Sequence, residues 1–175
     1  NGVTMFMEPG TAFEPDAVAD AVRAVGIRAS LTDAFVWDDK NNPRAIAITR
    51  APADTDRALR RLGGQLHRNG DPEALIRGHV NVWGGGTASA MLESAASELA
   101  RKSGAVFNQH QSLTKASAEV DDARFGRHPL VHFAELGILG PHCTFVHMNH
   151  LRDDEVDAVA TSGMSLVWCA TTSMN

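Results

Sequence analysis

Two short stretches decide the fold: residues 105–112, AVFNQHQS, and residues 143–150, CTFVHMNH. Each is a mostly apolar run typical of a buried β-strand, and each carries a histidine near its C-terminal end. The sequence between them is helix-forming. In a parallel α/β barrel the chemistry lies at the C-terminal ends of the strands, so His110 and His147 are predicted to converge on one metal ion or one substrate.

The rest of the chain alternates between the two kinds of element. Strands are predicted over residues 2–7, 26–32, 75–83, 105–112, 143–150 and 164–170, and helices over residues 15–25, 53–68, 89–103, 129–136 and 153–161. This order predicts an α/β fold with parallel strands and outer helices, either doubly wound or a barrel. No G-x-G-x-x-G follows the first strand, which disfavours the dinucleotide-binding version. We expect six consecutive strands that form an open arc of a barrel.

Composition sets limits on the function. A chain of 175 residues with 43% apolar and 21% charged residues is long enough for one domain, residues 1–175. The net charge of −5 gives no reason to expect nucleic acid or anionic lipid as a partner. No apolar run reaches the about 18 residues that span a bilayer, and no signal peptide pattern opens the chain. Cys143 and Cys169 match no disulfide or zinc-ribbon spacing, so a reduced cytoplasmic setting is expected.

Several motifs resemble the amidohydrolase superfamily, in particular its branch of cytosolic deaminases and chlorohydrolases. They are GVT at 2–4, FNQH at 107–110, PLVHFAELGILGP at 129–141, FVH at 145–147, LRDDEV at 151–156, SG at 162–163 and MSLVWC at 164–169 with Ser173 and Asn175. The match is closest from residue 105 onward. The resemblance implies a partial TIM (β/α)8 barrel that covers roughly strands two to seven, with residues 107–110 on the fifth strand and residues 145–147 on the sixth.

The sequence also departs from the family pattern. The family's His-x-His pair lies on its first strand and its metal-binding aspartate on its eighth, and this chain contains no His-x-His and stops after something like the seventh strand. Many deaminases carry a glutamate three residues after the strand-five histidine, where this chain has Leu113. Ala170 and Thr171 stand where proline and a small residue are usual. The simplest interpretation is an internal piece of a longer, truncated domain, which by itself would lack activity.

By resemblance, His110 is a metal ligand. His147 either binds the metal or donates to the hydroxide or the substrate as a catalytic residue. The metal is expected to be zinc, with iron as the alternative, and it would lower the pKa of a water from about 15.7 toward about 7. Neutral imidazole suits such a site because it binds a metal through one nitrogen and donates through the other. A catalytic zinc site has three protein ligands, so this ligand set is incomplete.

Other polar and aromatic residues have structural interpretations. His150 is expected on a loop or rim, His79 in core packing or an inward polar contact, and His128, His132 and His142 in solvent. Residues 84–86, GGG, are interpreted as a strand-to-helix turn. Asp121, Asp122 and Arg124 are interpreted as a solvated loop, and Cys169 as a small hydrophobe. Trp37, Trp83 and Trp168 all fall near strand ends, where core packing is the usual role, although one could cover a flat substrate ring.

Two hypotheses of different class follow. The first is part of a metal-dependent amidohydrolase that acts on non-peptide C–N bonds, by deamination or by cyclic amide or amidine hydrolysis, or on C–Cl bonds of a small heterocyclic or amide substrate. The second is a catalytically empty α/β-barrel domain that keeps the scaffold for binding or assembly. Because residues 3–7 and 166–170 would leave two open sheet edges without proline or charge, we also expect a homo-oligomer.

Overall fold

The computed structural model describes residues 2–40, 53–84 and 86–170. Every strand in these ranges pairs in parallel with its neighbours, in two sheets of order β1-β2-β3 and β4-β5-β6-β7. The strands are β1 (Met5–Met7), β2 (Arg28–Leu31), β3 (Ile76–Gly78), β4 (Val80–Gly84), β5 (Phe107–Gln111), β6 (Cys143–His147) and β7 (Ser165–Val167). The order in space follows the order in sequence, so the predicted parallel α/β fold with a partial barrel is confirmed.

The predicted strand at residues 75–83 is divided in two, which corrects the expectation of six continuous strands. The break falls at His79, whose backbone N–H donates to Leu31 O in β2 at 3.0 Å. The next N–H, of Val80, instead donates to Val106 O beside β5 at 2.9 Å. One extended segment therefore ends the first sheet and begins the second, and it joins the two into one arc.

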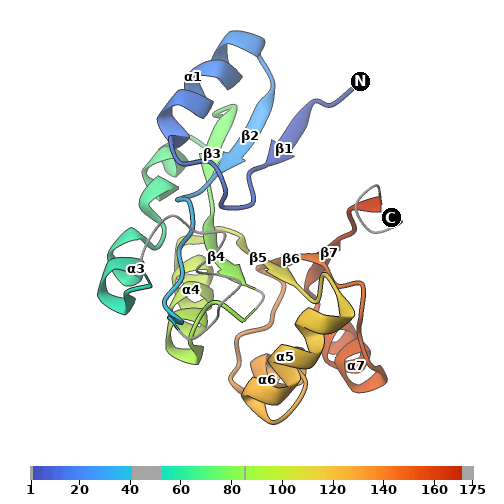
Figure 1. Cartoon of the computed structure of the whole chain (residues 1–175). Coiled ribbons are helices and arrows are strands. Elements are labelled where there is room, and N and C mark those ends of the chain that lie inside the picture. The colour runs from blue at the N-terminus through green and yellow to red at the C-terminus, as the bar shows by residue number, and fades with distance from the viewer. Residues whose placement is uncertain (1, 41–52, 85, 171–175) are drawn as a thin grey trace.

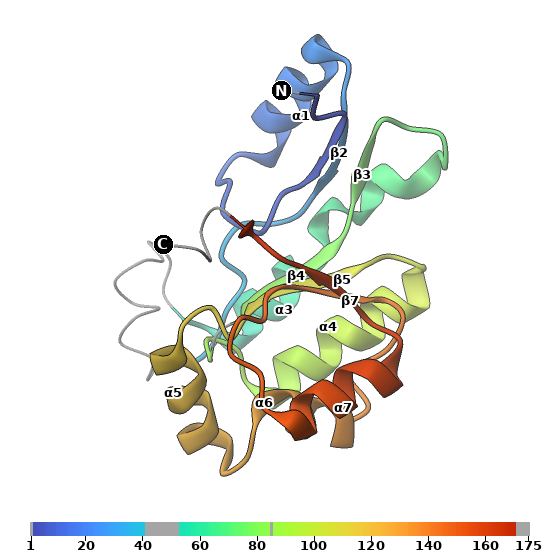
Figure 2. The same ribbon diagram turned by 90° about the vertical axis from the view of Figure 1, so that its right-hand side faces the viewer.

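Helices cover one side of this arc. They are α1 (Pro15–Val25), α3 (Thr55–Arg61), the 3-10 helix η1 (Gly64–Gly70), α4 (Ala90–Ser103), α5 (Lys115–Phe125), α6 (Pro129–Glu135) and α7 (Asp153–Ser162). Figure 1 shows α1 beside the first sheet and the remaining α-helices around the second. Turned by 90°, the strands β4 to β7 lie above α4, α6 and α7 (Figure 2). No helix in the described ranges is long and apolar enough to cross a membrane.

One predicted helical boundary is wrong. The helix expected over residues 53–68 stops after Arg61, because Gly63 adopts a left-handed φ of 72° and the chain continues as the 3-10 helix η1. A Cβ at Gly63 would lie 2.7 Å from Leu99 Cδ2, the movable end of a leucine side chain, so it is the positive φ that favours glycine at this turn.

Helix α5 corrects the interpretation of residues 121–124 as a solvated loop. Thr114 and Ser117 form a reciprocal capping box at its start, and Gly126 ends it at a φ of 66°. Asp121 is buried, and Arg124 donates to the carbonyl of Ala88 at 2.8 Å. The helix has few apolar side chains, which is why helical periodicity did not reveal it.

The main core lies between the second sheet and its helices. Val80, Val82, Phe107 and Phe145 face α4 and α6 there, and the rings of Phe107 and Phe145 meet edge to face at 5.5 Å. Since side chains alternate along a strand, the residues between them face the concave side of the arc. On that side the Asn81 amide donates to Asn108 O at 2.9 Å. The arc therefore has an apolar outer face and a polar inner face.

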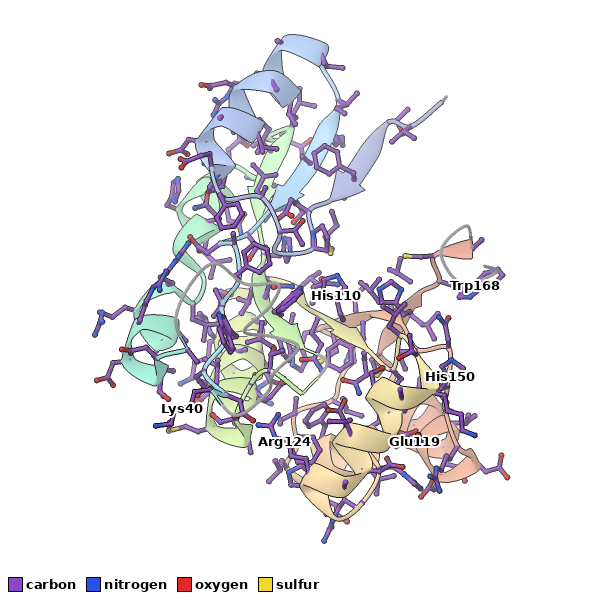
Figure 3. All side chains as sticks on the ribbon, in the orientation of Figure 1. Lys40, His110, Glu119, Arg124, His150 and Trp168 are labelled. Carbon is purple, nitrogen blue, oxygen red and sulfur yellow. The ribbon has the colours of Figure 1, made fainter. Side chains whose placement is uncertain are left out.

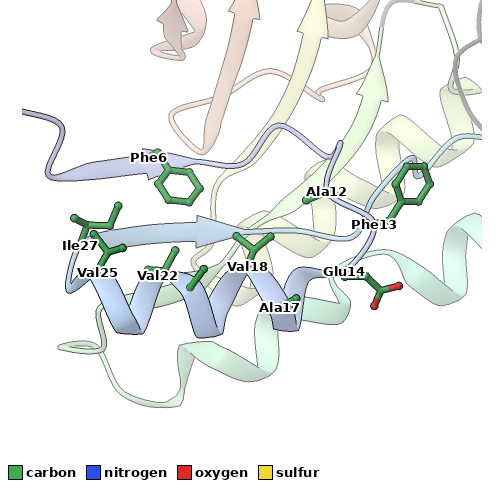
Figure 4. A pocket seen from close by; sticks show the side chains of 10 residues that line it. Phe6, Ala12, Phe13, Glu14, Ala17, Val18, Val22, Val25 and Ile27 are labelled. Carbon is green, nitrogen blue, oxygen red and sulfur yellow. The ribbon is translucent and has the colours of Figure 1, made fainter. Parts of the chain in front are cut away.

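An apolar groove of about 630 Å³ runs between α1 and the edge strand β1 (Figure 4). Phe6, Val18, Val22 and Ile27 line it, and Phe13 lies at one end. The β1 edge also exposes Met5. Within the described ranges, β1 and β7 each have a neighbour on one side only, as expected for the ends of an open arc.

Candidate functional site

His110 and His147 lie at the C-terminal ends of the adjacent strands β5 and β6. Their ring centroids are 5.5 Å apart, and the ring planes are inclined by 28°. The two strands pair in parallel, so both histidines lie at the same edge of the sheet. The structure thus brings together the two residues that the sequence singled out.

The His110 ring is held in a defined orientation. Its Nδ1 lies 3.0 Å from the carbonyl oxygen of Trp83. A carbonyl only accepts, so Nδ1 carries the hydrogen and Nε2 keeps its lone pair in the neutral ring. Burial lowers the pKa of His110, which favours this neutral form at pH 7. His110 therefore presents a free Nε2 of the kind that binds a metal.

Glycine is required where β4 approaches this histidine. Gly84 ends β4 at a φ of 74°, and a Cβ there would lie 2.1 Å from the backbone oxygen of His110. Thr87 Oγ1 donates to the Gly84 carbonyl at 2.7 Å and leads the chain toward α4. The chain thus turns from β4 toward α4 at Gly86 and Thr87, as predicted, while Gly85 lies outside the described residues. Gly84 in addition lets the ends of β4 and β5 meet.

The side chain of His147 lies beside His110 because the backbone at His147 departs from a regular strand conformation. It pairs in register with Gln111, which follows Phe107 on the helix-facing side of β5, so a regular strand would direct His147 toward the helices. Instead His147 and Met148 have φ values of 78° and 51°, in the left-handed region. Such a conformation costs a β-carbon-bearing residue on the order of 1–3 kcal/mol.

The His147 side chain is buried, and its Nδ1 makes no hydrogen bond to any described residue. A buried nitrogen without a partner is unfavourable unless a ligand completes it. Burial and the proximity of His110 both lower the pKa of His147. Two neutral imidazoles with unused nitrogens therefore lie side by side, and this donor set fits a divalent metal such as zinc.

Within the described residues, however, no group of three or more His, Cys, Asp or Glu side chains converges as a metal site. His150 is exposed and lies away from His110, as does the exposed Trp168 (Figure 3). The predicted rim position of His150 is thus supported. Trp168 is 56% exposed, so the expected core role is wrong for that residue, whereas Trp37 is buried.

The remaining histidines all have partners. His79 is buried, with Nδ1 2.9 Å from Ser30 Oγ, and burial lowers its pKa to about 4. This confirms the inward polar contact expected of it. The three others, expected in solvent, are only partly exposed. His128 Nδ1 lies 2.8 Å from Asp122, His142 Nε2 lies 2.8 Å from Ser97, and His132 stacks on Phe125.

A buried polar layer behind the histidine pair was not foreseen. Glu93 of α4 is fully buried, and the Gln109 amide nitrogen, turned toward it, donates to both carboxylate oxygens at 2.7 and 2.9 Å. Burial raises the pKa of Glu93 well above its usual range. Asp121 of α5 is also buried, and its pKa rises to about 6. The signal in the sequence was two glutamines, Gln109 and Gln111, at the helix-facing positions of a strand.

The cysteines take no part in this site. Cys143 is buried, and desolvation raises the pKa of its thiol to about 12, so it carries almost no thiolate at neutral pH. Cys169 is half-buried near the end of the described chain. The interpretation of Cys169 as a small hydrophobe stays a prediction.

Comparison with known proteins gives two curated relatives, while no family model matches. A 5-methylthioadenosine/S-adenosylhomocysteine deaminase from Symbiobacterium thermophilum is 26% identical over 175 residues, which is 99% of this chain and 37% of the relative. A protein of the same description from Syntrophobacter fumaroxidans is 29% identical over 150 residues, 86% of this chain and 32% of the relative. The chain therefore spans about a third of the length of each relative.

Solved structures show the same fold. A triazine hydrolase from Arthobacter aurescens superposes with a TM-score of 0.78 at 17% identity, over 94% of this chain and 38% of that one. An adenosine deaminase from Xanthomonas campestris with bound zinc gives 0.72 at 22%, over 96% and 36%. A guanine deaminase from C. acetobutylicum with bound guanine gives 0.78 at 15%, over 99% and 42%. These likenesses confirm the predicted partial barrel.

Proposed function

We propose, from the now confirmed resemblance to the amidohydrolase superfamily, that this chain is part of a metal-dependent hydrolase. Its reaction would be hydrolysis of a non-peptide C–N bond, by deamination or by opening of a cyclic amide or amidine, or of a C–Cl bond. The observation that carries the proposal is the pair of neutral imidazoles, His110 and His147, at one edge of the sheet. The curated relatives, both described as deaminases, favour C–N bonds and a small heterocyclic substrate.

In this proposal His110 is a metal ligand through Nε2, and the Trp83 carbonyl holds its other nitrogen protonated. His147 is either a second ligand or the residue that donates a hydrogen bond to the substrate. A bound divalent ion, zinc or else iron, supplies a Lewis acid that makes water a nucleophile at neutral pH. The lowered pKa of both rings supports these roles, because only neutral imidazole offers a lone pair.

A second candidate is the catalytically empty scaffold. Leu113 favours it, because it occupies the position of the glutamate that many deaminases use to move protons, and an apolar side chain cannot do so. The ligand set of the described residues also falls short of the three that a catalytic zinc needs. We therefore expect the 175-residue chain alone to bind zinc weakly and to release no ammonia from adenosine.

The free thiols of Cys143 and Cys169 support a reduced cytoplasmic setting.

Calorimetric titration of the chain with zinc at pH 7.5 tests the proposal. We expect binding that His110→Ala abolishes and that His147→Ala weakens at least tenfold. His150→Ala is the matched control, because it removes an exposed imidazole three residues from His147. Binding should also weaken as the pH falls below 6, since protons then compete for the ring nitrogens. Equal affinity in His110→Ala and His150→Ala would favour the empty scaffold.

A further inference from the structure

A second cavity lies beside the first sheet, away from the histidine pair. Its volume is about 230 Å³, and it is bounded by β1, β2, the segment from β3 to His79 and residues 104–106. We call it the arginine cavity, and its lining residues include Met5, Met7, Arg28, Ser30, Arg77 and His79.

The strand register places these residues on one face of the first sheet. Met7 pairs with Ser30, and Ser30 pairs with Arg77. Arg28 lies two residues before Ser30, and His79 lies two residues after Arg77, so the alternation along a strand directs all five to the same face. The other face packs against α1 through Phe6, Ala29, Leu31 and Ile76. The arginine cavity therefore lies on the side of the sheet opposite α1.

Both arginines of the cavity are available to an anion. The ion pairs within the described ranges engage other arginines, and neither Arg28 nor Arg77 has a partner there. Both residues are exposed. Two guanidinium groups on one face make a local positive site in a chain whose net charge is −5. Arginine binds carboxylates and phosphates through a planar fork of donors, so this site favours an anionic group.

Ser30 and His79 add a hydrogen-bond donor next to Arg77. His79 is 1% exposed, and its Nδ1 lies 2.9 Å from Ser30 Oγ. The hydroxyl and the neutral ring each have one donor, and the contact between them uses only one of the two. The backbone of Glu8 also interacts with the ring, but Nε2 completes no hydrogen bond to any described residue. In either tautomer one O–H or N–H of this buried pair is left for a ligand.

The rest of the cavity wall is largely apolar. Met5, Met7, Leu75 and Val106 line it, and methionine adapts its shape to a bound chain. The cavity is smaller than the roughly 300–1,000 Å³ of sites for drug-sized molecules. Its occupant is therefore a small molecule that combines one anionic group with a short apolar part.

The arginine cavity is separate from the histidine pair. It includes residues 104–106, which directly precede β5, whereas His110 lies near the other end of that strand. Four residues separate Val106 from His110, which at about 3.3 Å per residue is roughly 13 Å along the strand. Figure 1 shows the first sheet above the strands β5 and β6 that carry the histidines. The C-terminal strand ends hold the substrate in a parallel barrel, so this cavity is a different site.

We propose that the arginine cavity binds a small carboxylate with a short, unbranched apolar chain. The carboxylate lies between Arg77 and the Ser30–His79 pair, with Arg28 as the second cation. The apolar chain lies along Met5 and Met7. This inference is independent of the proposed function and involves no metal. The alternative that the experiment must exclude is a pair of solvated arginines that bind nothing.

NMR of the 175-residue chain with ¹³C-labelled methionine methyl groups tests the site. The probe is hexanoate, added at pH 7.5 in phosphate-free buffer of low ionic strength with EDTA, where the carboxylate and both guanidinium groups are charged. We expect saturable shifts of the Met5 and Met7 methyl signals. Met91, which is 58% exposed on α4, should not shift. Hexanol has the same chain and acetate the same charge, and each should bind at least fivefold more weakly than hexanoate.

Variants show which groups bind the carboxylate. Arg77→Gln should weaken hexanoate binding at least fivefold, and Arg77→Lys, which keeps the charge without the fork, should weaken it less. Arg60→Gln is the matched control, because Arg60 is an exposed arginine of α3 that does not line the cavity. If Arg77→Gln does not fold, Arg28→Gln replaces it with the same expectation. No saturable shift at Met5 and Met7, equal binding of hexanoate and hexanol, or an equal loss in Arg60→Gln would each overturn the proposal.

Discussion

Replacing Asp121 with asparagine should remove part of the pH dependence of the free energy of unfolding. Asp121 is 1% exposed on α5, and neither carboxylate oxygen has a hydrogen-bond partner among the described residues. Desolvation raises its pKa from 3.8 to about 6, although the positive charge of Arg124 opposes the shift. At pH 7.5 the wild-type protein therefore holds an ionised carboxylate in a buried place.

The size of the effect follows from proton linkage. Between pH 3.8 and about 6 the folded protein keeps the Asp121 proton while the unfolded chain releases it. The folded state binds more protons in this window, so the contribution of Asp121 to stability falls as the pH rises. A shift of roughly two pKa units corresponds to about 3 kcal/mol as an upper bound. Asparagine does not titrate. The difference in the free energy of unfolding between Asp121→Asn and wild type should therefore shift in favour of the variant by up to about 3 kcal/mol when the pH is raised from 3.5 to 7.5.

Urea unfolding followed by tryptophan fluorescence measures this at both pH values. The difference between the two pH values matters, because the packing change of the amide is the same at each and cancels. Asp20→Asn is the control: its carboxylate pairs with Arg23 on the surface of α1 and should contribute less than about 1 kcal/mol at either pH. An Asp121→Asn effect that is equal at pH 3.5 and pH 7.5 would refute the reasoning.

Two further predictions concern His79 and helix α5. The pKa of His79 is about 4 in the folded protein against 6.5 for an ordinary histidine, so its contribution makes stability rise with pH across that window, and His79→Gln should flatten the rise by about 3 kcal/mol in the same urea assay. Thr114→Ala removes the side-chain oxygen that accepts from Ser117 N at the start of α5 and should cost about 1 kcal/mol, read from the urea midpoint; no loss would mean that the capping box contributes nothing.

The strands and the histidine pair could both be predicted from the sequence, because both depend on recognising buried strands. Apolar runs bounded by glycine and polar residues are the strongest local signal of a buried strand, and parallel pairing then brings strand ends together. It placed His110 and His147 as neighbours because both lie at strand ends.

What it could not locate depends on contacts that are distant in sequence. Between His79 and Val80 the backbone changes its hydrogen-bond partner from β2 to Val106. Nothing local in residues 75–83 indicates this change. Helix α5 has almost no apolar face, and its start is set by the two hydroxyls of Thr114 and Ser117. The left-handed φ of His147 likewise has no sequence signature, because glycine or asparagine is the residue that usually marks such a position.

That left-handed backbone sets folding stability and chemistry against each other at one residue. Glycine would relieve the strain at position 147, but glycine carries no imidazole, so the more stable sequence would lose the ring beside His110. A screen that selects variants of this chain for thermal resistance alone should therefore enrich glycine at position 147. Selection that also requires the paired rings should keep histidine there and collect its stabilising changes elsewhere in the fold.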